Sequence, residues 1–239
     1  MSESKIKSRW IKVGEINCHY LVGGEGSPLV LIHGSGSCAE DEWKLNLEPL
    51  TQHHRIYAPD LIGFGKTDKP RLDYGFQLFS SFFEEFISAL NLKKISLLGH
   101  SLGGEIALGF TLKYPEQIEK LILVDSTGFT EDITLIGKLI SPFFVLKAKL
   151  RNDETSLSMA RNRKKNIVSF LDKLPEITTP TLIVWGRWDG YLPVKLAYKA
   201  HRLIKNSQLY IFKRCWHAPQ REKPTEFNRL ILNFLKAGR

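Results

Sequence analysis

Short runs of consecutive apolar residues recur along the chain and alternate with longer amphipathic stretches. In six of these runs Val, Ile and Leu follow one another without polar alternation, as in strands that are covered on both faces of a sheet. The runs span residues 28–32, 55–58, 94–98, 121–124, 181–185 and 208–212. Strands separated by segments of helical length predict βα units on a mostly parallel sheet.

Two further runs and several helices complete this pattern. Residues 9–13 and 16–21 are separated by Gly14 and Glu15, which predicts an antiparallel hairpin and brings the sheet to eight strands. Helical periodicity is evident in residues 76–90, directly after Ser101, and most clearly in residues 224–236. In the last segment the apolar residues recur at i, i+3, i+4, i+7 and i+8, and form one stripe. They are Phe227, Leu230, Ile231, Phe234 and Leu235.

One segment interrupts the alternation of strands and helices. Residues 128–179 are helix-like and rich in apolar and basic side chains, which predicts a helical insertion over the edge of the sheet. We therefore expect a core of residues 1–127 and 180–239 and a cap of residues 128–179. The most apolar stretch, residues 133–146, is broken by Lys138 and Pro142, so we expect no stable membrane insertion.

The apolar part of this insertion has two interpretations. We expect the run from Leu135 to Leu146 to line the pocket. The alternative is an interfacial lid, because Lys147, Lys149 and Arg151 follow directly.

Composition and charge narrow the class of protein. The 239 residues carry a formal net charge of +9, with eleven Lys or Arg against two Glu in residues 194–239. No nucleic-acid-binding motif accompanies this charge, so we interpret it as solvated helix faces and expect no nucleic-acid partner. Three cysteines without CxxC spacing give no zinc signature and favour a reducing compartment. With no apolar segment in the first ten residues, we expect a cytoplasmic protein.

The sequence Gly99-His100-Ser101-Leu102-Gly103 matches the G-x-S-x-G pattern of a nucleophile elbow. It follows a predicted strand and precedes a predicted helix, which is the context that the pattern requires. The glycines leave room for a strained turn, and the new helix directs its N-terminus at the reacting atom. Ser101 is therefore the candidate nucleophile.

A serine nucleophile needs a base and an acid that orients the base. His217 lies in the loop after the last strand, and Asp189 follows the strand before it. The order Ser101, Asp189, His217 is the order in which this kind of fold places a triad. Asp125, at the end of another strand, is the alternative acid. His33 is expected to shape its own loop.

The loop after the first buried strand, His33-Gly34-Ser35-Gly36, is small enough for a substrate oxygen to approach its backbone. We expect the amides of Leu102 and Ser35 to form the oxyanion hole. The substrate pocket is expected to be lined by five residues: Gly34, Gly36, His100, Trp188 and Trp216. The P-loop pattern and the dinucleotide-binding pattern are both missing, so we expect neither a cofactor nor a metal.

These motifs together resemble the α/β-hydrolase fold, and the chain is similar to its serine hydrolases over nearly its whole length. The resemblance rests on PLVLIHGSG, YAPDLIGFGKTDKP, LLGHSLGG, LILVDS, PTLIVWGRWD and HAPQREKP, in that order. It implies that Ser101 is the nucleophile, His217 the general base and Asp189 the orienting acid. It also implies that residues 128–179 are the cap. A serine at position 101 excludes the epoxide hydrolase and haloalkane dehalogenase branches, which have Asp there.

Within the family, HGSG is similar to the loop of meta-cleavage product hydrolases, which cut a C–C bond in ring-fission products. Those enzymes usually have Asn before the nucleophile, whereas His100 is the type common in esterases and lipases. Trp216 stands where Gly is usual, and the cap is shorter than in that group. These departures favour a serine carboxylesterase acting on small to medium acyl esters.

Three other functions remain open. A C–C hydrolase of anionic diketo acids would use Arg151, Arg161 or Arg163 for the carboxylate, although solvated helix faces are the simpler interpretation of these arginines. A ligand receptor with slow turnover could retain the same fold and triad. A hydrolase acting at a lipid surface is the third. The sequence leaves the natural substrate and the oligomeric state open.

Overall fold

The computed structural model describes residues 6–129, 135–162 and 168–237 of the chain. In these residues, eight strands form one sheet in the order β1-β2-β4-β3-β5-β6-β7-β8. Pairing is antiparallel between β1 and β2 and between β2 and β4, and parallel from β4 through β8. The predicted mostly parallel sheet of eight strands is confirmed.

The strands are β1 (Ile6–Val13), β2 (Ile16–Gly23), β3 (Pro28–Ile32), β4 (Arg55–Pro59), β5 (Ile95–His100), β6 (Ile118–Val124), β7 (Thr181–Gly186) and β8 (Ser207–Phe212). The helices are α1 (Ala39–Trp43), α2 (Leu47–Thr51), α3 (Phe76–Ala89), α4 (Leu102–Lys113), α5 (Leu135–Leu150), α6 (Glu154–Arg161), α7 (Lys195–Leu203), α8 (Pro219–Glu222) and α9 (Pro224–Lys236). The 3₁₀ turns within the described ranges are η1 (Pro115–Gln117) and η3 (Leu171–Glu176). Each predicted strand is present, but β6 begins earlier than its apolar run because exposed Glu119 interrupts that run near the start of the strand.

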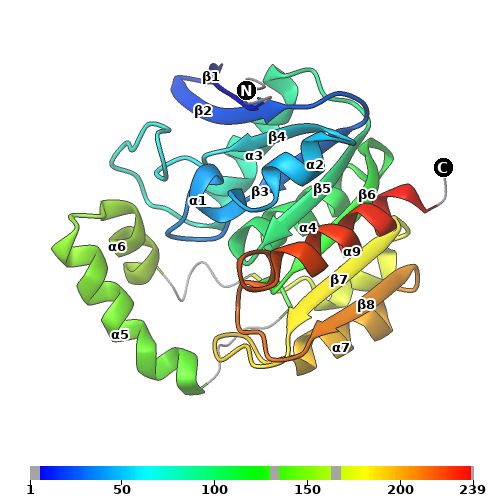
Figure 1. Ribbon diagram of the computed structural model, residues 1–239. Coiled ribbons are helices and arrows are strands. Elements are labelled where there is room, and N and C mark those ends of the chain that lie inside the picture. The colour runs from blue at the N-terminus through cyan, green and yellow to red at the C-terminus, as the bar shows by residue number, and fades with distance from the viewer. Residues whose placement is uncertain (1–5, 130–134, 163–167, 238–239) are drawn as a thin grey trace.

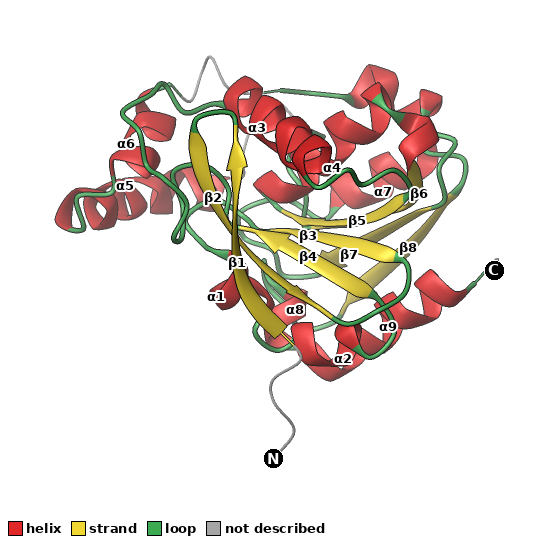
Figure 2. Ribbon diagram, turned by 90° about the horizontal axis from the view of Figure 1, so that it is seen from above, coloured by secondary structure: helices red, strands yellow, loops and turns green. Residues whose placement is uncertain are grey.

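Helices cover both faces of the sheet, as Figure 2 shows from above. One core lies under α3, α4 and α7, and the other lies under α1, α2 and α9. Consecutive residues of β3 alternate between the two cores: Val30 and Ile32 pack in the first, Leu29 and Leu31 in the second. Burial on both faces explains why the central strands are continuously apolar in sequence.

The region predicted as the cap contains α5, α6 and η3 and no strand among its described residues. Helix α6 is tied to the loop between β4 and α3, because Thr155 Oγ1 donates to Gly63 O at 2.9 Å. Helices α5 and α6 lie beside the sheet rather than in its helical layers (Figure 1). The division of the chain at residues 128 and 179 stays a prediction.

The orientation of α5 differs from the sequence-based expectation. We expected the apolar run from Leu135 to Leu146 to line the pocket, but within it Leu139, Phe143 and Leu146 are exposed. The reason is that α5 turns its opposite face inward, where Ala148 is buried. The other large apolar side chains of the run, at positions 135, 136, 140 and 144, lie outside the described side chains, and for them the expectation stays a prediction. None of the helices among the described residues combines the length and the hydropathy needed to cross a membrane.

Candidate active site

Ser101 lies on a sharp turn between β5 and α4. Its φ of 52° and ψ of −115° lie outside the regions that ordinary residues favour. A Cβ on Gly99 would lie 2.2 Å from the carbonyl oxygen of Gly103, and a Cβ on Gly103 would lie 2.1 Å from that of Ile32. Only glycine fits these two positions, so the turn holds the Ser101 side chain at the carboxyl end of β5 and the N-terminus of α4.

Three side chains from separate loops form a continuous hydrogen-bonded chain. Nε2 of His217 lies 3.2 Å from Oγ of Ser101, and Nδ1 of the same ring lies 2.7 Å from Oδ2 of Asp189. Asp189 follows β7 and His217 follows β8. Because these strands run parallel to β5, both residues lie at the edge of the sheet where β5 ends. When Nδ1–H donates to Asp189, Nε2 is the acceptor for the Ser101 hydroxyl. The three residues predicted as catalytic are thus in contact.

The carboxylate of Asp189 is held by its own loop. Oδ1 accepts hydrogen bonds from the amides of Tyr191 at 2.7 Å and Leu192 at 2.9 Å. Burial alone would raise the pKa of Asp189, but the hydrogen bonds from His217 and Leu192 outweigh it and hold the pKa below its ordinary value. Asp189 is therefore a fixed negative charge that orients the His217 ring.

Asp125, the alternative acid, is a second buried carboxyl group at this site. Its Oδ1 accepts the Gly186 amide at 3.0 Å, and the hydrogen bond to His217 comes from Asp189 instead. Burial and the charge of Asp189 both raise the pKa of Asp125 well above its ordinary value. Both causes favour the protonated form of Asp125 over a second negative charge beside Asp189.

The backbone of His217 is fixed from two sides. The Glu222 carboxylate accepts the amides of the residues before and after His217, from Trp216 at 2.9 Å and from Ala218 at 3.1 Å. Nε2 of His100 donates to the His217 carbonyl oxygen at 2.7 Å. The sequence analysis missed Glu222, because a carboxylate that accepts backbone amides of its own loop is not marked by a recognisable sequence motif.

His100 belongs to a buried pair behind the triad. Its Nδ1 lies 2.7 Å from Oε1 of Glu42, and both side chains are buried. Burial alone would lower the pKa of His100 and raise the pKa of Glu42, but the attraction between the two charges outweighs it in both groups. We expected His100 to line the pocket; the structure instead turns both of its nitrogens to protein groups. A Cβ on Gly34 would lie 2.9 Å from Nδ1, so Gly34 makes room for this ring.

The loop after β3 lies next to Ser101. His33 is buried and bonded on both nitrogens, to Gly34 O at 2.8 Å and to the Leu61 amide at 2.9 Å, which fixes the loop. Ser35 is exposed, and its Oγ contacts Sδ of Met159 on α6 at 3.6 Å. Leu102 begins α4, so its amide has no acceptor within the helix. The oxyanion-hole roles of Ser35 and Leu102 stay predictions.

Three further residues of the predicted pocket are exposed. Gly36 has a φ of 72° and is exposed. Trp188 and Trp216, next in sequence to Asp189 and His217, are 51% and 57% exposed, and their ring centroids are 6.4 Å apart. Their role in binding a substrate stays a prediction.

The described residues contain one group whose atoms could together hold a metal ion, formed by Asp125, Asp189 and His217, with these atoms within 4.8 Å of one another. Asp189 Oδ2 and His217 Nδ1 already bond each other in this group. The group is therefore explained by the hydrogen-bonded chain, and the expectation of no metal stays a prediction.

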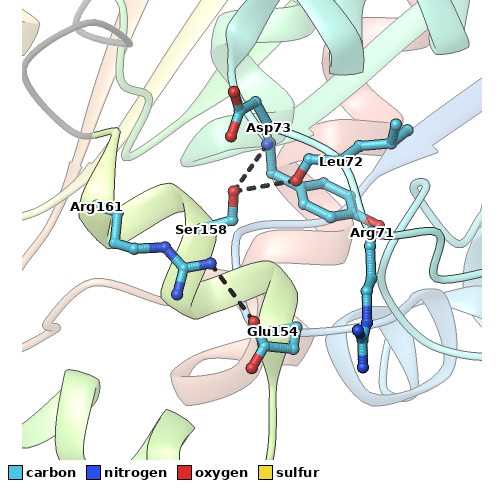
Figure 3. Close-up of a pocket in the computed structure, with 7 residues that line it drawn as sticks. Arg71, Leu72, Asp73, Glu154, Ser158 and Arg161 are labelled. Atoms are coloured by element: carbon cyan, nitrogen blue, oxygen red, sulfur yellow. Dashed lines mark hydrogen bonds and ion pairs between the residues drawn. The ribbon is translucent and has the colours of Figure 1, made fainter.

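A cavity of about 480 Å³ lies between α6 and the loop that precedes α3 (Figure 3). None of its lining residues belongs to the hydrogen-bonded chain at Ser101. Ser158 bridges its wall by accepting the Tyr74 amide at 3.0 Å and donating to Leu72 O at 3.1 Å. Arg161 lines this cavity, is largely exposed and pairs with Glu154 at 3.4 Å. Arg151 is also exposed, and Arg163 lies outside the described residues.

Comparisons with known proteins agree with this architecture. The family model described as the alpha/beta hydrolase fold matches residues 27–163. The chain is 31% identical to a 2-hydroxy-6-oxo-6-(2'-aminophenyl)hexa-2,4-dienoic acid hydrolase of Metapseudomonas resinovorans, over 98% of this chain and 92% of the relative.

Two solved structures are similar over most of the chain. A meta-cleavage product hydrolase from Pseudomonas fluorescens superposes with a TM-score of 0.84 at 27% identity, covering 98% of each chain. A bacterial membrane phospholipase A superposes with a TM-score of 0.86 at 25% identity, covering 97% of this chain and 86% of that one. The family model covers more than half of the chain, and the 31% identical relative covers nearly all of it: this chain belongs to the α/β-hydrolase fold family.

Proposed function

We propose that this protein is a serine hydrolase in which Ser101 is the nucleophile, His217 the general base and Asp189 the acid that orients His217. The observation that carries the proposal is the chain of hydrogen bonds from Asp189 through His217 to Ser101. A hydroxyl becomes a useful nucleophile when a neighbouring base takes its proton during attack. The strained turn presents Oγ of Ser101 to that base.

The reaction proceeds by acyl transfer to Ser101 and then to water. Nε2 of His217 takes the hydroxyl proton while Oγ attacks the substrate carbonyl, and Asp189 stabilises the imidazolium that forms. The oxyanion lies at the N-terminus of α4, where the amide of Leu102 and the helix dipole favour negative charge. The leaving group departs with the proton from His217, and water activated by His217 releases the acyl group.

As substrate class we propose the C–C bond of ring-fission products, 2-hydroxy-6-oxo-dienoates. Relatives named for this reaction match the chain over nearly their whole length. The 2-hydroxydienoate would first ketonise, losing its hydroxyl proton and gaining one at C5, which gives a 2,6-dioxo acid. Ser101 would then attack the 6-oxo carbonyl, and cleavage of the C5–C6 bond leaves its electron pair delocalised from C5 onto the 2-oxo group. The resulting dienolate takes the proton from His217 on that oxygen. Water then releases the acyl group as a carboxylic acid, so water adds H to one fragment and OH to the other.

Carboxylic esters are the second candidate substrate class, and two observations favour them. The cap arginines that are described, Arg151 and Arg161, are exposed, and Arg161 pairs with Glu154, so neither is engaged with the triad. His100 stands before Ser101, where meta-cleavage product hydrolases usually have Asn. An alkoxide leaving group needs no conjugated system and no carboxylate-binding residue.

A panel of substrates tests these proposals. We would measure kcat/KM for p-nitrophenyl acetate, p-nitrophenyl butyrate and 2-hydroxy-6-oxo-6-phenylhexa-2,4-dienoate, with Ser101→Ala as the inactive control. A higher value for the dienoate supports C–C hydrolysis, and a higher value for the esters reverses the order. Stoichiometric labelling of Ser101 without turnover of any substrate would identify a ligand receptor and contradict both enzyme proposals.

A further inference from the structure

Helix α5 exposes apolar side chains where a surface helix ordinarily exposes polar ones. Four apolar residues on it are more than half exposed: Leu139 (71%), Phe143 (66%), Leu146 (53%) and Leu150 (78%). Their spacing places them within about 60° of one another around the helix axis. They form one continuous row along the helix, which we call the α5 stripe.

The opposite face of α5 is the one that packs on the protein. Ala148 is buried there, and Ser141 and Val145 are half-buried. Among the residues of α5 whose side chains are described, the leucines and Phe143 therefore lie outward. A surface helix ordinarily turns such large apolar side chains toward its own core.

Basic residues flank the α5 stripe on both sides. Lys147 and Lys149 are exposed, and they lie roughly 80° to either side of the stripe around the helix axis. The sequence of α5 contains no Asp or Glu. An apolar row between lysines is the pattern of a helix that lies in a lipid interface, where the lysine stems extend to the phosphate groups.

A second exposed apolar cluster lies at the rim of the Ser101 site. Trp188 and Trp216 pack edge to face there, and three exposed basic residues lie within three positions of them: Arg187, Lys213 and Arg214. One exposed carboxylate, that of Glu222, also lies there and accepts the Trp216 amide. The loops after β7 and β8 that carry them leave the same edge of the parallel sheet as the chain between β6 and α5. In the view of Figure 1, α5 begins on the side of the molecule where β7 and β8 end.

We propose that the α5 stripe and the Trp188–Trp216 pair dock this protein on an anionic lipid surface. Exposed Leu and Phe enter the boundary of the acyl chains, tryptophan rings prefer the headgroup level, and lysines and arginines bind anionic headgroups. Charge decides against a second copy of the chain as the occupant. A symmetric contact through the stripe would bring lysine-flanked surfaces together in a protein of net charge +9. Docking in this way turns the rim of the Ser101 site toward the lipid.

The test is co-sedimentation of the full chain with vesicles of phosphatidylcholine alone and of phosphatidylcholine with phosphatidylglycerol. The variant Leu139→Gln/Leu146→Gln/Leu150→Gln removes three exposed side chains of the stripe and keeps good helix formers. Leu45→Gln is the control, because this leucine is exposed and lies outside α5, between α1 and α2. Lys147→Gln/Lys149→Gln removes the flanking charges alone. No substrate is involved, so the outcome is independent of the proposed hydrolase activity.

We expect wild type to bind the phosphatidylglycerol vesicles and the control to bind equally well. The leucine variant should bind at least roughly tenfold more weakly, and the lysine variant about tenfold more weakly on the same vesicles. The tryptophan emission of wild type should shift to shorter wavelength on binding, and Trp188→Phe/Trp216→Phe should lose most of this shift.

Two results would overturn the proposal. One is wild-type protein that stays in solution with both kinds of vesicle, or a leucine variant that binds as wild type does. The other is a dimer of wild type, seen by light scattering without vesicles, that the leucine variant dissociates, because the stripe would then be an interface between copies.

Discussion

Glu105 offers a quantitative test of the electrostatics behind Ser101. Its side chain lies in α4, one turn beyond Ser101, and is 6% exposed. Oε2 accepts the Thr127 hydroxyl at 2.6 Å, and the same hydroxyl lies 3.2 Å from the Ser101 carbonyl oxygen. Burial, only partly offset by the Thr127 hydrogen bond, raises the pKa of Glu105 from 4.5 to about 7. The perturbation is Glu105→Gln, which resembles the protonated carboxyl group in shape and can still accept from Thr127.

The sign and the size follow from proton linkage. Below pH 4.5 the folded and unfolded states both bind the proton, so this group adds no pH dependence. From pH 4.5 to about 7 the folded state keeps the proton that the unfolded state releases, so the free energy of unfolding falls as pH rises. The loss is complete above the pKa that Glu105 has in the folded state. It amounts to about 3 kcal/mol, since each unit by which the folded-state pKa exceeds the unfolded-state pKa contributes about 1.4 kcal/mol. Glu105→Gln lacks this loss.

The assay is urea unfolding followed by tryptophan fluorescence at a series of pH values between 4 and 8. The free energy of unfolding of Glu105→Gln minus that of wild type should rise by about 3 kcal/mol across the window from 4.5 to 7 and then level off. Taking the difference cancels the other titrating groups, including Asp125. Glu116→Gln, which removes an exposed carboxylate, is the control. A difference that stays constant across the whole pH range would refute the reasoning.

Three further predictions concern the triad and its supports. Asp189→Asn should lower kcat on the order of ten-thousand-fold. Asp125→Asn, which resembles the protonated acid, should keep kcat within a few-fold of wild type. A larger loss of kcat in Asp125→Asn than in Asp189→Asn, measured in steady-state assays, would assign the role of the acid to Asp125. Glu222→Gln should lower kcat by roughly tenfold or more with KM little changed, because the loop of the base loses one of its two amide contacts; an unchanged kcat would show that the contacts are dispensable. Gly186→Ala should destabilise the fold by roughly 3 kcal/mol or more, because its Cβ would lie 1.7 Å from a backbone carbonyl oxygen of the β8–α8 loop. Gly36→Ala, with open space but a φ of 72°, should cost only about 1 kcal/mol, and urea unfolding of both variants measures the difference.

The fold and the contact of Ser101, Asp189 and His217 could be predicted because their signals are local in sequence. Strands buried on both faces must be continuously apolar, and the turn at Ser101 needs glycines at fixed positions. The order of the acid and the base then follows from the order of the strands. Each of these constraints acts within a few residues, and the sheet brings the three segments together.

The supports of the site could not be predicted, because they are contacts between distant segments. Glu42 contacts His100 only because α1 packs on the sheet, and no spacing in the sequence indicates that the two residues form a pair. The orientation of α5 is a similar case: the apolar run signals a helix, but which of its faces turns outward depends on how α5 packs against α6. Long-range contacts of this kind decide the role of a residue without changing its local pattern.

The most direct test of the central claim is to find where the acyl group goes. Wild-type protein would be mixed with p-nitrophenyl acetate, quenched in acid within the first turnover and digested, and the peptides would be examined by mass spectrometry. The account predicts an acetyl group on Ser101 in wild type. In Ser101→Ala it predicts no acetylated peptide and a loss of turnover on the order of a million-fold. An acetyl group on another residue such as Cys38, or burst kinetics that persist in Ser101→Ala, would contradict the assignment of Ser101 as the nucleophile.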